Sequence, residues 1–260
     1  MSLEQQKRRG LSIEILLVLG VSLGRSALYS IVDLIGKLTA GKPLAAQSTV
    51  LNPTHAANRP WLDLSLQLLQ ILFGAVPAFL ALHLLHRDQN RNLEPAQRSD
   101  PVGLRPHRIG RDTGSGFLLA ALIGIPGLAF YFASRAVGIN TTVIPEALPL
   151  VFWTVPVLLL AAVENALLEE VVVVGYLVTR LGELGWSLRL IVATSALLRG
   201  SYHLYQGFGG FVGNVVMGIV FALFFVRIKR VGPLIVAHAL LDIVAFVGYA
   251  LLRGHVSFLP

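Results

Sequence analysis

The sequence predicts an all-α fold, a polytopic membrane bundle of about seven transmembrane helices, each roughly 20 residues long. Two observations predict it. Of the 260 residues, 55% are hydrophobic and only 13% are charged, and the mean hydropathy is +0.71. Both values are far from those of soluble domains. Helices of this length use up nearly the whole chain, so we expect no separate soluble domain.

The predicted spans follow one another as apolar runs. They lie at residues 11–35, 62–85, 116–137, 148–181, 187–205, 211–226 and 231–252. The first is longer than the apolar core of a signal peptide and has no small-residue cleavage site, so we expect an uncleaved helix. Pro126 predicts a kink in the third. As a helix, the fourth would measure roughly 50 Å, too long for one upright span, so it must tilt, break or project.

The charged residues predict the orientation. The formal net charge is +7, but the basic residues fall between apolar runs, which is typical of membrane topology and argues against a nucleic-acid partner. Lys and Arg gather in the N-terminal tail, in residues 87–111, and in the turns after the fourth and sixth spans. By the positive-inside rule we expect a plasma (inner) membrane protein with a cytoplasmic N-terminus. The absence of cysteine excludes disulfides and thiolate chemistry.

Acidic residues interrupt the fourth apolar run. Glu169 and Glu170 are adjacent there, and Glu164 precedes them. An ionised side chain facing lipid costs at least a few kcal/mol, so buried acids usually face a partner or a polar cavity inside the bundle. They are therefore candidates for a functional site.

Two other predicted spans supply titratable partners. His203 lies near the end of the fifth, and His238 and Asp242 are four residues apart in the seventh. That spacing puts them on one helix face, where the carboxylate can orient the imidazole. Each residue alone has an ordinary structural interpretation, such as a histidine satisfied by a helix–helix hydrogen bond. Together they favour one polar cavity that three helices share.

The residue types limit the chemistry of such a cavity. No serine or cysteine nucleophile has a partner at a recognisable spacing, and there is no His-Glu-x-x-His zinc helix. What remains is water activation, in which a carboxylate and an imidazole take a proton from the water and a second imidazole stabilises the oxyanion. Three alternatives stay open: a zinc protease built on two His and a Glu, a catalytically silent membrane immunity or binding module, and a proton-coupled transporter.

The motifs resemble those of a known family. Glu169-Glu170 on one helix, His203 on the next, and His238-x-x-x-Asp242 on the last are similar to the three motifs of the CPBP (Abi) family. This group of intramembrane glutamic endopeptidases includes the CAAX prenyl protease 2-like and bacteriocin-processing proteins. The resemblance covers roughly residues 115–252.

The resemblance implies a role for each residue. Glu169 would be the catalytic base acting with His203 on water, and Glu170 would support the site. His238 and Asp242 would stabilise the oxyanion. It implies no metal and no cofactor.

The resemblance also implies an organisation and a partner. Residues 1–114 would form N-terminal membrane helices and a basic cytoplasmic loop, residues 115–252 the protease core, and residues 253–260 a tail. The substrate would be a peptide or membrane protein, prenylated at a C-terminal CaaX sequence in the eukaryotic branch and met among membrane lipids. The sequence leaves the substrate and the oligomeric state open.

Two positions depart from the family pattern. The first motif usually reads Glu-Glu-x-x-x-Arg, but Val174 stands at the Arg position; the second usually reads Phe-x-x-x-His, but Arg199 stands at the Phe position. We hypothesise that the Arg199 guanidinium crosses to Glu170 and replaces the missing cation. The alternative is an Arg199 that snorkels towards the membrane surface beside an inactive site.

Overall fold

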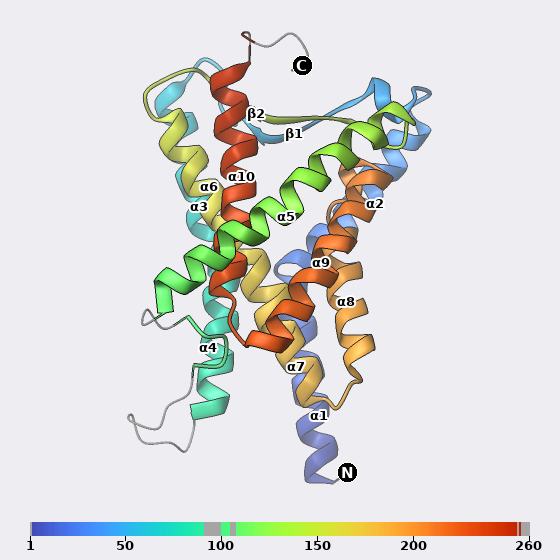
Figure 1. The fold of residues 1–260 in the computed structure, drawn as a ribbon, viewed down its shortest axis with the longest axis vertical. Coiled ribbons are helices and arrows are strands. Elements are labelled where there is room, and N and C mark those ends of the chain that lie inside the picture. Colours follow the sequence, from blue (N-terminus) through green and yellow to red (C-terminus); the bar gives the residue numbers. More distant parts are fainter. Residues whose placement is uncertain (1, 91–99, 105–107, 254, 256–260) are drawn as a thin grey trace.

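The computed structural model describes residues 2–90, 100–104, 108–253 and 255, and confirms the all-α prediction (Figure 1). Arg91, Arg98 and Arg105 of the predicted basic loop lie outside the described residues, as does most of the predicted tail. The N-terminal helices are α1 Leu3–Gly20, α2 Leu23–Thr39, α3 Pro60–Gly74, α4 Val76–Asn90 and α5 Ile109–Ala136. The C-terminal ones are α6 Thr154–Glu169, the π-helix η4 Glu170–Tyr176, α7 Leu177–Glu183, α8 Leu188–Ser201, α9 Phe208–Ile228 and α10 Gly232–Leu252.

Fewer helices qualify as membrane spans than the sequence predicts. In the described part of the chain, four are long and apolar enough to cross a membrane, or up to five if the bent pair α1–α2 is one span. The count of seven is therefore not confirmed. The α6–α7 run does not qualify because it carries several charged residues, and α8 has only 14 residues.

The two N-terminal apolar runs are interrupted to different degrees. The α1–α2 pair bends by 53°, whereas α3 and α4, which are interrupted only at Ala75, together form one candidate span, Pro60–Asp88. At this second break Gly74 faces α6, and a Cβ on it would come within 2.3 Å of a Glu164 carboxylate oxygen. Glu164 thus packs against the α3–α4 junction. Pro126 lies inside α5, which continues through it.

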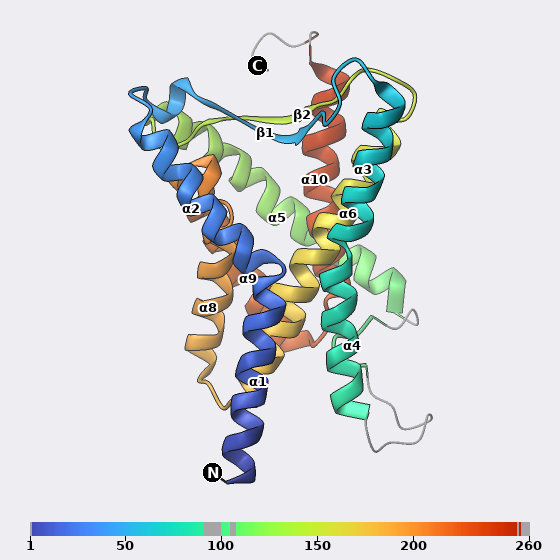
Figure 2. The ribbon, with the colours of Figure 1, turned by 180° about the vertical axis from the view of Figure 1, so that it is seen from behind.

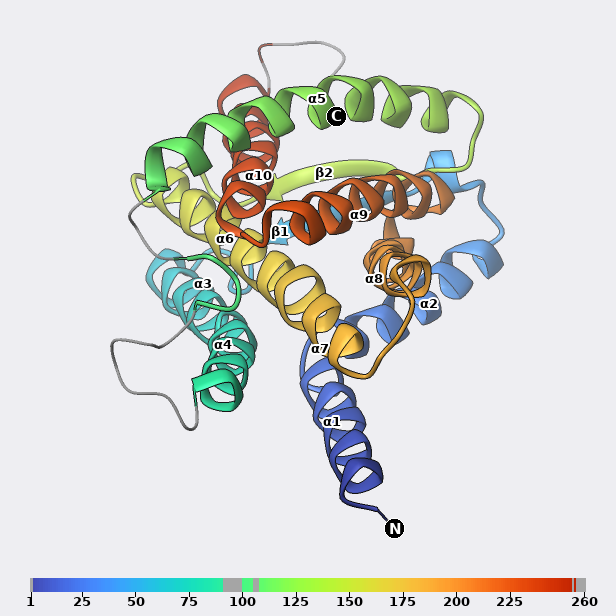
Figure 3. The same ribbon diagram turned by 60° about the horizontal axis from the view of Figure 1, so that its bottom comes forward.

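Close helix packing builds the C-terminal half. Viewed from the end that carries the N-terminus, the α6–α7 run crosses the middle of the bundle, with α5 and α10 on one side and α3–α4 on the other (Figure 3). Glycines let α8 and α9 approach each other. A Cβ at Gly200 would lie 2.5 Å from Val215, and one at Gly218 would lie 2.8 Å from the Ala196 Cα. Small residues allow such backbone contact between membrane helices.

Two buried arginines form ion pairs that connect the ends of several helices. Arg180, only 1% exposed, pairs with Glu14 at 2.9 Å, Asp88 at 2.8 Å and Glu183 at 2.8 Å, and so joins α1, α4 and α7. Between α9 and α10, Arg230 pairs with Asp112 of α5. Arg230 donates hydrogen bonds to the Asp112 carboxylate, and these raise the pKa of Arg230 above its ordinary value.

A short sheet, which the sequence analysis did not predict, crosses the far end of the bundle. Strands β1 Ser48–Pro53 and β2 Thr142–Ala147 are parallel, with Ser48 opposite Thr142 and Val50 opposite Ile144 (Figures 1 and 2). The short 3₁₀ helix η1 Leu44–Ala46 precedes β1. The strands belong to the two long loops that precede α3 and α6.

The α8–α9 contact predicts a difference between two glycines of α9. Gly218→Ala places a methyl group against the Ala196 backbone, whereas at Gly213 a Cβ would lie at an ordinary 3.6 Å from Phe130. Overpacking costs about 1–3 kcal/mol, while Ala in a helix interior gains up to about 1 kcal/mol over Gly. We expect Gly218→Ala to lower the melting temperature in detergent and Gly213→Ala to leave it unchanged or raise it. Equal melting temperatures would contradict this packing.

Candidate active site

A change of helix type sets the direction of the two adjacent glutamates. The α-helix α6 ends at Glu169, and the π-helix begins at Glu170. All seven residues of the π-helix are buried, including four consecutive valines, whose β-branched side chains weaken α-helical preference. The carbonyl of Val173 accepts a hydrogen bond of 3.0 Å from the Ser195 hydroxyl of α8. Such π segments are frequent at functional sites.

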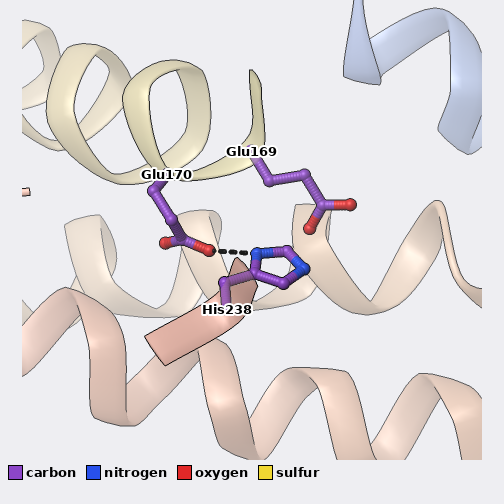
Figure 4. A group of neighbouring side chains, drawn as sticks. All are labelled: Glu169, Glu170 and His238. Atoms are coloured by element: carbon purple, nitrogen blue, oxygen red, sulfur yellow. Dashed lines mark hydrogen bonds and ion pairs between the residues drawn. The ribbon is translucent and has the colours of Figure 1, made fainter. Parts of the chain in front are cut away.

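The two carboxylates have different surroundings. Glu170 is 0% exposed and Glu169 is 8% exposed. The His238 ring lies below them, and its Nδ1 donates to Oε1 of Glu170 at 2.7 Å (Figure 4). This bond joins α10 to the start of the π-helix.

Arg199 supplies the cation for both acids. Its Nη2 lies 3.1 Å from Oε2 of Glu169 and forms a shorter ion pair with Oε1 of Glu170. The hypothesis that the guanidinium crosses from α8 to Glu170 is therefore confirmed. The snorkelling alternative is wrong, because Arg199 is 0% exposed and stands 5.2 Å from the centre of the Phe221 ring. Val174, at the usual Arg position, is buried in the apolar core.

Glu169 has two further neighbours from the end of α8. The Tyr202 hydroxyl donates to Oε2 of Glu169 at 2.9 Å, and Nε2 of His203 lies 3.8 Å from the same oxygen. This buried Nε2 has no hydrogen-bond partner within the described part of the chain. The sequence analysis missed Tyr202. The available signal was its spacing, three residues after Arg199, which places the two side chains on one helix face.

The turn after α8 holds His203 in place. Its Nδ1 lies 3.3 Å from Nε2 of Gln206 in the 3₁₀ helix η5 Leu204–Gln206. Gly207 follows with φ of +108°, and a Cβ there would come within 2.6 Å of the Ile139 carbonyl oxygen. Glycine is required at this point because other residues rarely adopt a positive φ.

Asp242 completes the cluster from α10. Its Oδ2 lies 3.7 Å from Nε2 of His238 and receives a 3.4 Å hydrogen bond from Nδ2 of Asn165. Asn165, another residue that the sequence analysis missed, is on α6 one turn before Glu169. The structure thus brings Glu169, Glu170, His203, His238 and Asp242 together, as the sequence predicts. Nε2 of His203 lies 3.8 Å from Oε2 of Glu169, and one ligand atom each of Glu169 and His238 lie within 4.8 Å of each other.

Part of the cluster has the composition of a metal site. One ligand atom each from Glu169, Glu170 and His238 lie within 4.8 Å of one another, close enough to hold an ion. However, Oε1 of Glu170 already contacts both Arg199 and Nδ1 of His238. A metal bound through these atoms would have to displace a guanidinium and a ring proton.

The comparisons with known proteins agree with this geometry. Residues 151–244 match the family described as Type II CAAX prenyl endopeptidase Rce1-like. The matched segment contains all five predicted site residues and Arg199. No curated protein and no solved structure matches the chain. The match supports the resemblance on which the motif assignment rests, and over residues 151–244 the chain is similar to type II CAAX prenyl endopeptidases.

Proposed function

We propose that the chain is an intramembrane endopeptidase of the glutamic type, in which Glu169 and His203 activate a water that attacks a peptide bond. The observation that carries this proposal is the pair formed by Oε2 of Glu169 and the unbonded Nε2 of His203, 3.8 Å apart. A single water can contact both atoms. Its proton passes to this pair and then to the leaving amine, while the oxygen bonds to the carbonyl carbon.

The other groups take distinct roles. His238, beside Asp242, stabilises the oxyanion of the tetrahedral intermediate. Arg199 and Tyr202 hold Glu169 in its orientation by bonds of 3.1 Å and 2.9 Å to Oε2. Glu170 has no part in the proton transfer, because its Oε1 is occupied by Arg199 and His238. It supports the site by fixing these two side chains.

The substrate we propose is a peptide or membrane protein carrying a lipidated C-terminal CaaX sequence, following the description of the matched family. We further propose a plasma-membrane location with a cytoplasmic N-terminus. This orientation is supported by the position of the N-terminus, the α7–α8 turn and the α9–α10 turn at one end of the bundle (Figure 1). Lys and Arg cluster near the N-terminus and in the α9–α10 turn, and Arg180 and Arg189 flank the α7–α8 turn.

Removing the base tests the mechanism. We expect Glu169→Gln to lower cleavage of a farnesylated CaaX reporter peptide in proteoliposomes at least about a hundredfold, the usual contribution of general-base catalysis. Glu164→Gln is the matched control, since Glu164 is a partly buried carboxylate of the same helix that packs against Gly74. It should keep activity within a few-fold. If the Glu169→Gln enzyme cleaves the reporter as fast as wild type, the proposed mechanism is wrong. If the wild-type protein cleaves nothing, the result favours the catalytically silent membrane immunity or binding module.

Chelation separates the glutamic mechanism from a zinc protease. Because Arg199 already neutralises the carboxylates that an ion would need, we propose catalysis without a metal. Dialysis against 1,10-phenanthroline should leave the cleavage rate unchanged and elemental analysis should find no stoichiometric zinc. Loss of activity that added Zn²⁺ restores would instead favour a metal held by Glu169, Glu170 and His238.

The ion pair from Arg199 of α8 to Glu170 predicts that a second substitution can compensate for the loss of Arg199. Arg199→Phe leaves two buried acids without their cation, and breaking a buried pair in this way costs about 3–5 kcal/mol. We expect a lower melting temperature and loss of cleavage. Adding Val174→Arg should recover part of both, because position 174 lies four residues after Glu170 on the same run. Val174→Arg alone should be destabilising. A double variant no better than Arg199→Phe would contradict this exchange of positions.

A further inference from the structure

The two edges of the short sheet differ in how they are protected. The Thr142 amide donates to the Gln47 carbonyl, so Thr142, Ile144 and Glu146 point their backbone groups towards β1. The outer edge of β2 is blocked. There the Val143 amide donates to the Tyr131 hydroxyl at 2.9 Å, and Pro145 has no N–H and accepts from Asn52 at 2.9 Å. Capped donors and proline are common protections of strand edges.

The outer edge of β1 has no such protection. The same alternation turns the backbone N–H and C=O groups of Ser48, Val50 and Asn52 away from β2. Within the described chain these groups form no hydrogen bond. Ser48 and Val50 are exposed. The edge is therefore a row of unpaired donors and acceptors that repeats about every 6.6 Å, the spacing of an extended peptide.

The strand β1 is joined to the turn after α8, residues 202–207, which holds His203. The Thr49 hydroxyl donates to the Tyr205 carbonyl at 3.1 Å, and the Tyr205 ring stacks 6.2 Å from the His203 ring. Lys37 reaches both the Thr49 hydroxyl and the Tyr205 carbonyl. In opposite views β1 lies on the bundle side of β2, between the ends of α2 and α3 (Figures 1 and 2). A chain paired with β1 would thus run past the site at a fixed register.

We propose that the outer edge of β1 binds the peptide substrate as an added strand and presents the adjoining peptide bond to Glu169 and His203. The inference rests on the proposed function and deepens it, because it assigns the substrate an extended conformation recognised through its backbone. The unblocked edge belongs to the strand whose Thr49 hydroxyl bonds to the Tyr205 carbonyl, next to His203 in the sequence, whereas the outer edge of β2 is blocked. Recognition of this kind takes affinity from main-chain hydrogen bonds and tolerates varied side chains.

The test removes single hydrogen bonds from each partner. Val50→Pro deletes the central outward N–H of β1 but no bond of the β1–β2 ladder, and Val50→Ala is the matched control that keeps the N–H. For the farnesylated CaaX reporter we expect kcat/KM to fall about fivefold or more in Val50→Pro relative to Val50→Ala, the effect of one hydrogen bond. In the wild-type enzyme, reporters N-methylated at one amide each should lose rate at alternate positions only.

Each result decides the question. Equal kcat/KM for the two Val50 variants, at equal melting temperatures, or N-methylation effects without alternation overturn the added strand while leaving the protease function intact. If wild type does not cleave the reporter, the proposed function fails separately. In that case, amide hydrogen exchange of residues 48–52 is measured in Glu169→Gln protein with and without the reporter peptide. Slower exchange with the reporter supports its pairing with β1, and unchanged exchange overturns that pairing.

Discussion

The ion pair between Arg199 and the two glutamates is the interaction on which the rest of the site depends. Two adjacent carboxylates in an apolar core need a nearby cation, because an unpaired buried charge is strongly destabilising. Arg199 can serve because α8 lies close to α9 at Gly200 and Gly218, which holds the guanidinium beside the Phe221 ring. The Ser195 bond to Val173 fastens the same helix to the π segment. The packing of α8 against its neighbours thus also positions Arg199 for its ion pair with the two glutamates.

The division of labour that we propose for the two acids rests on their surroundings. Glu170 is fully enclosed, and its Oε1 is shared by Arg199 and His238. Glu169 is slightly exposed and meets Tyr202 and His203 from the end of α8. Two groups of identical chemistry acquire different tasks when their environments differ in this way. Adjacent residues of a helix point in different directions, and the change from α- to π-helix falls between these two.

Much of the site was predictable from the sequence because its residues are charged groups in apolar runs. Such residues need partners, and this need alone predicts that Glu169, His203 and His238 meet. The crossing of Arg199 was predicted from the family pattern instead, because Val174 stands where the usual Arg would pair with Glu170. The contribution of Tyr202 and Asn165 was not predictable, because neutral polar residues occur throughout helices and do not require a charged partner.

The limits of the fold prediction have physical causes too. Hydropathy identifies long apolar runs, but it does not locate a π-helix, whose residues 170–176 read as a continuation of α6. From hydropathy, the sequence analysis also predicted that α8 and the α6–α7 run are membrane spans. The short length of α8 and the charged residues of the α6–α7 run distinguish them from the four apolar candidate spans. The β1–β2 pair joins loops that are far apart in the sequence, and no local pattern reveals such a pairing.

The order of these groups along the chain has a consequence for how the protein enters the bilayer. The two acids emerge about 30 residues before Arg199, since sequence separations of 30 and 29 link them to it. While α6 stands alone, each carboxylate carries a cost of a few kcal/mol in hydrocarbon. Only when α8 has followed can the guanidinium cancel that charge. Entry of α6–α7 and α8 into the bilayer as one unit would avoid this cost, because the acids would meet their cation as they enter.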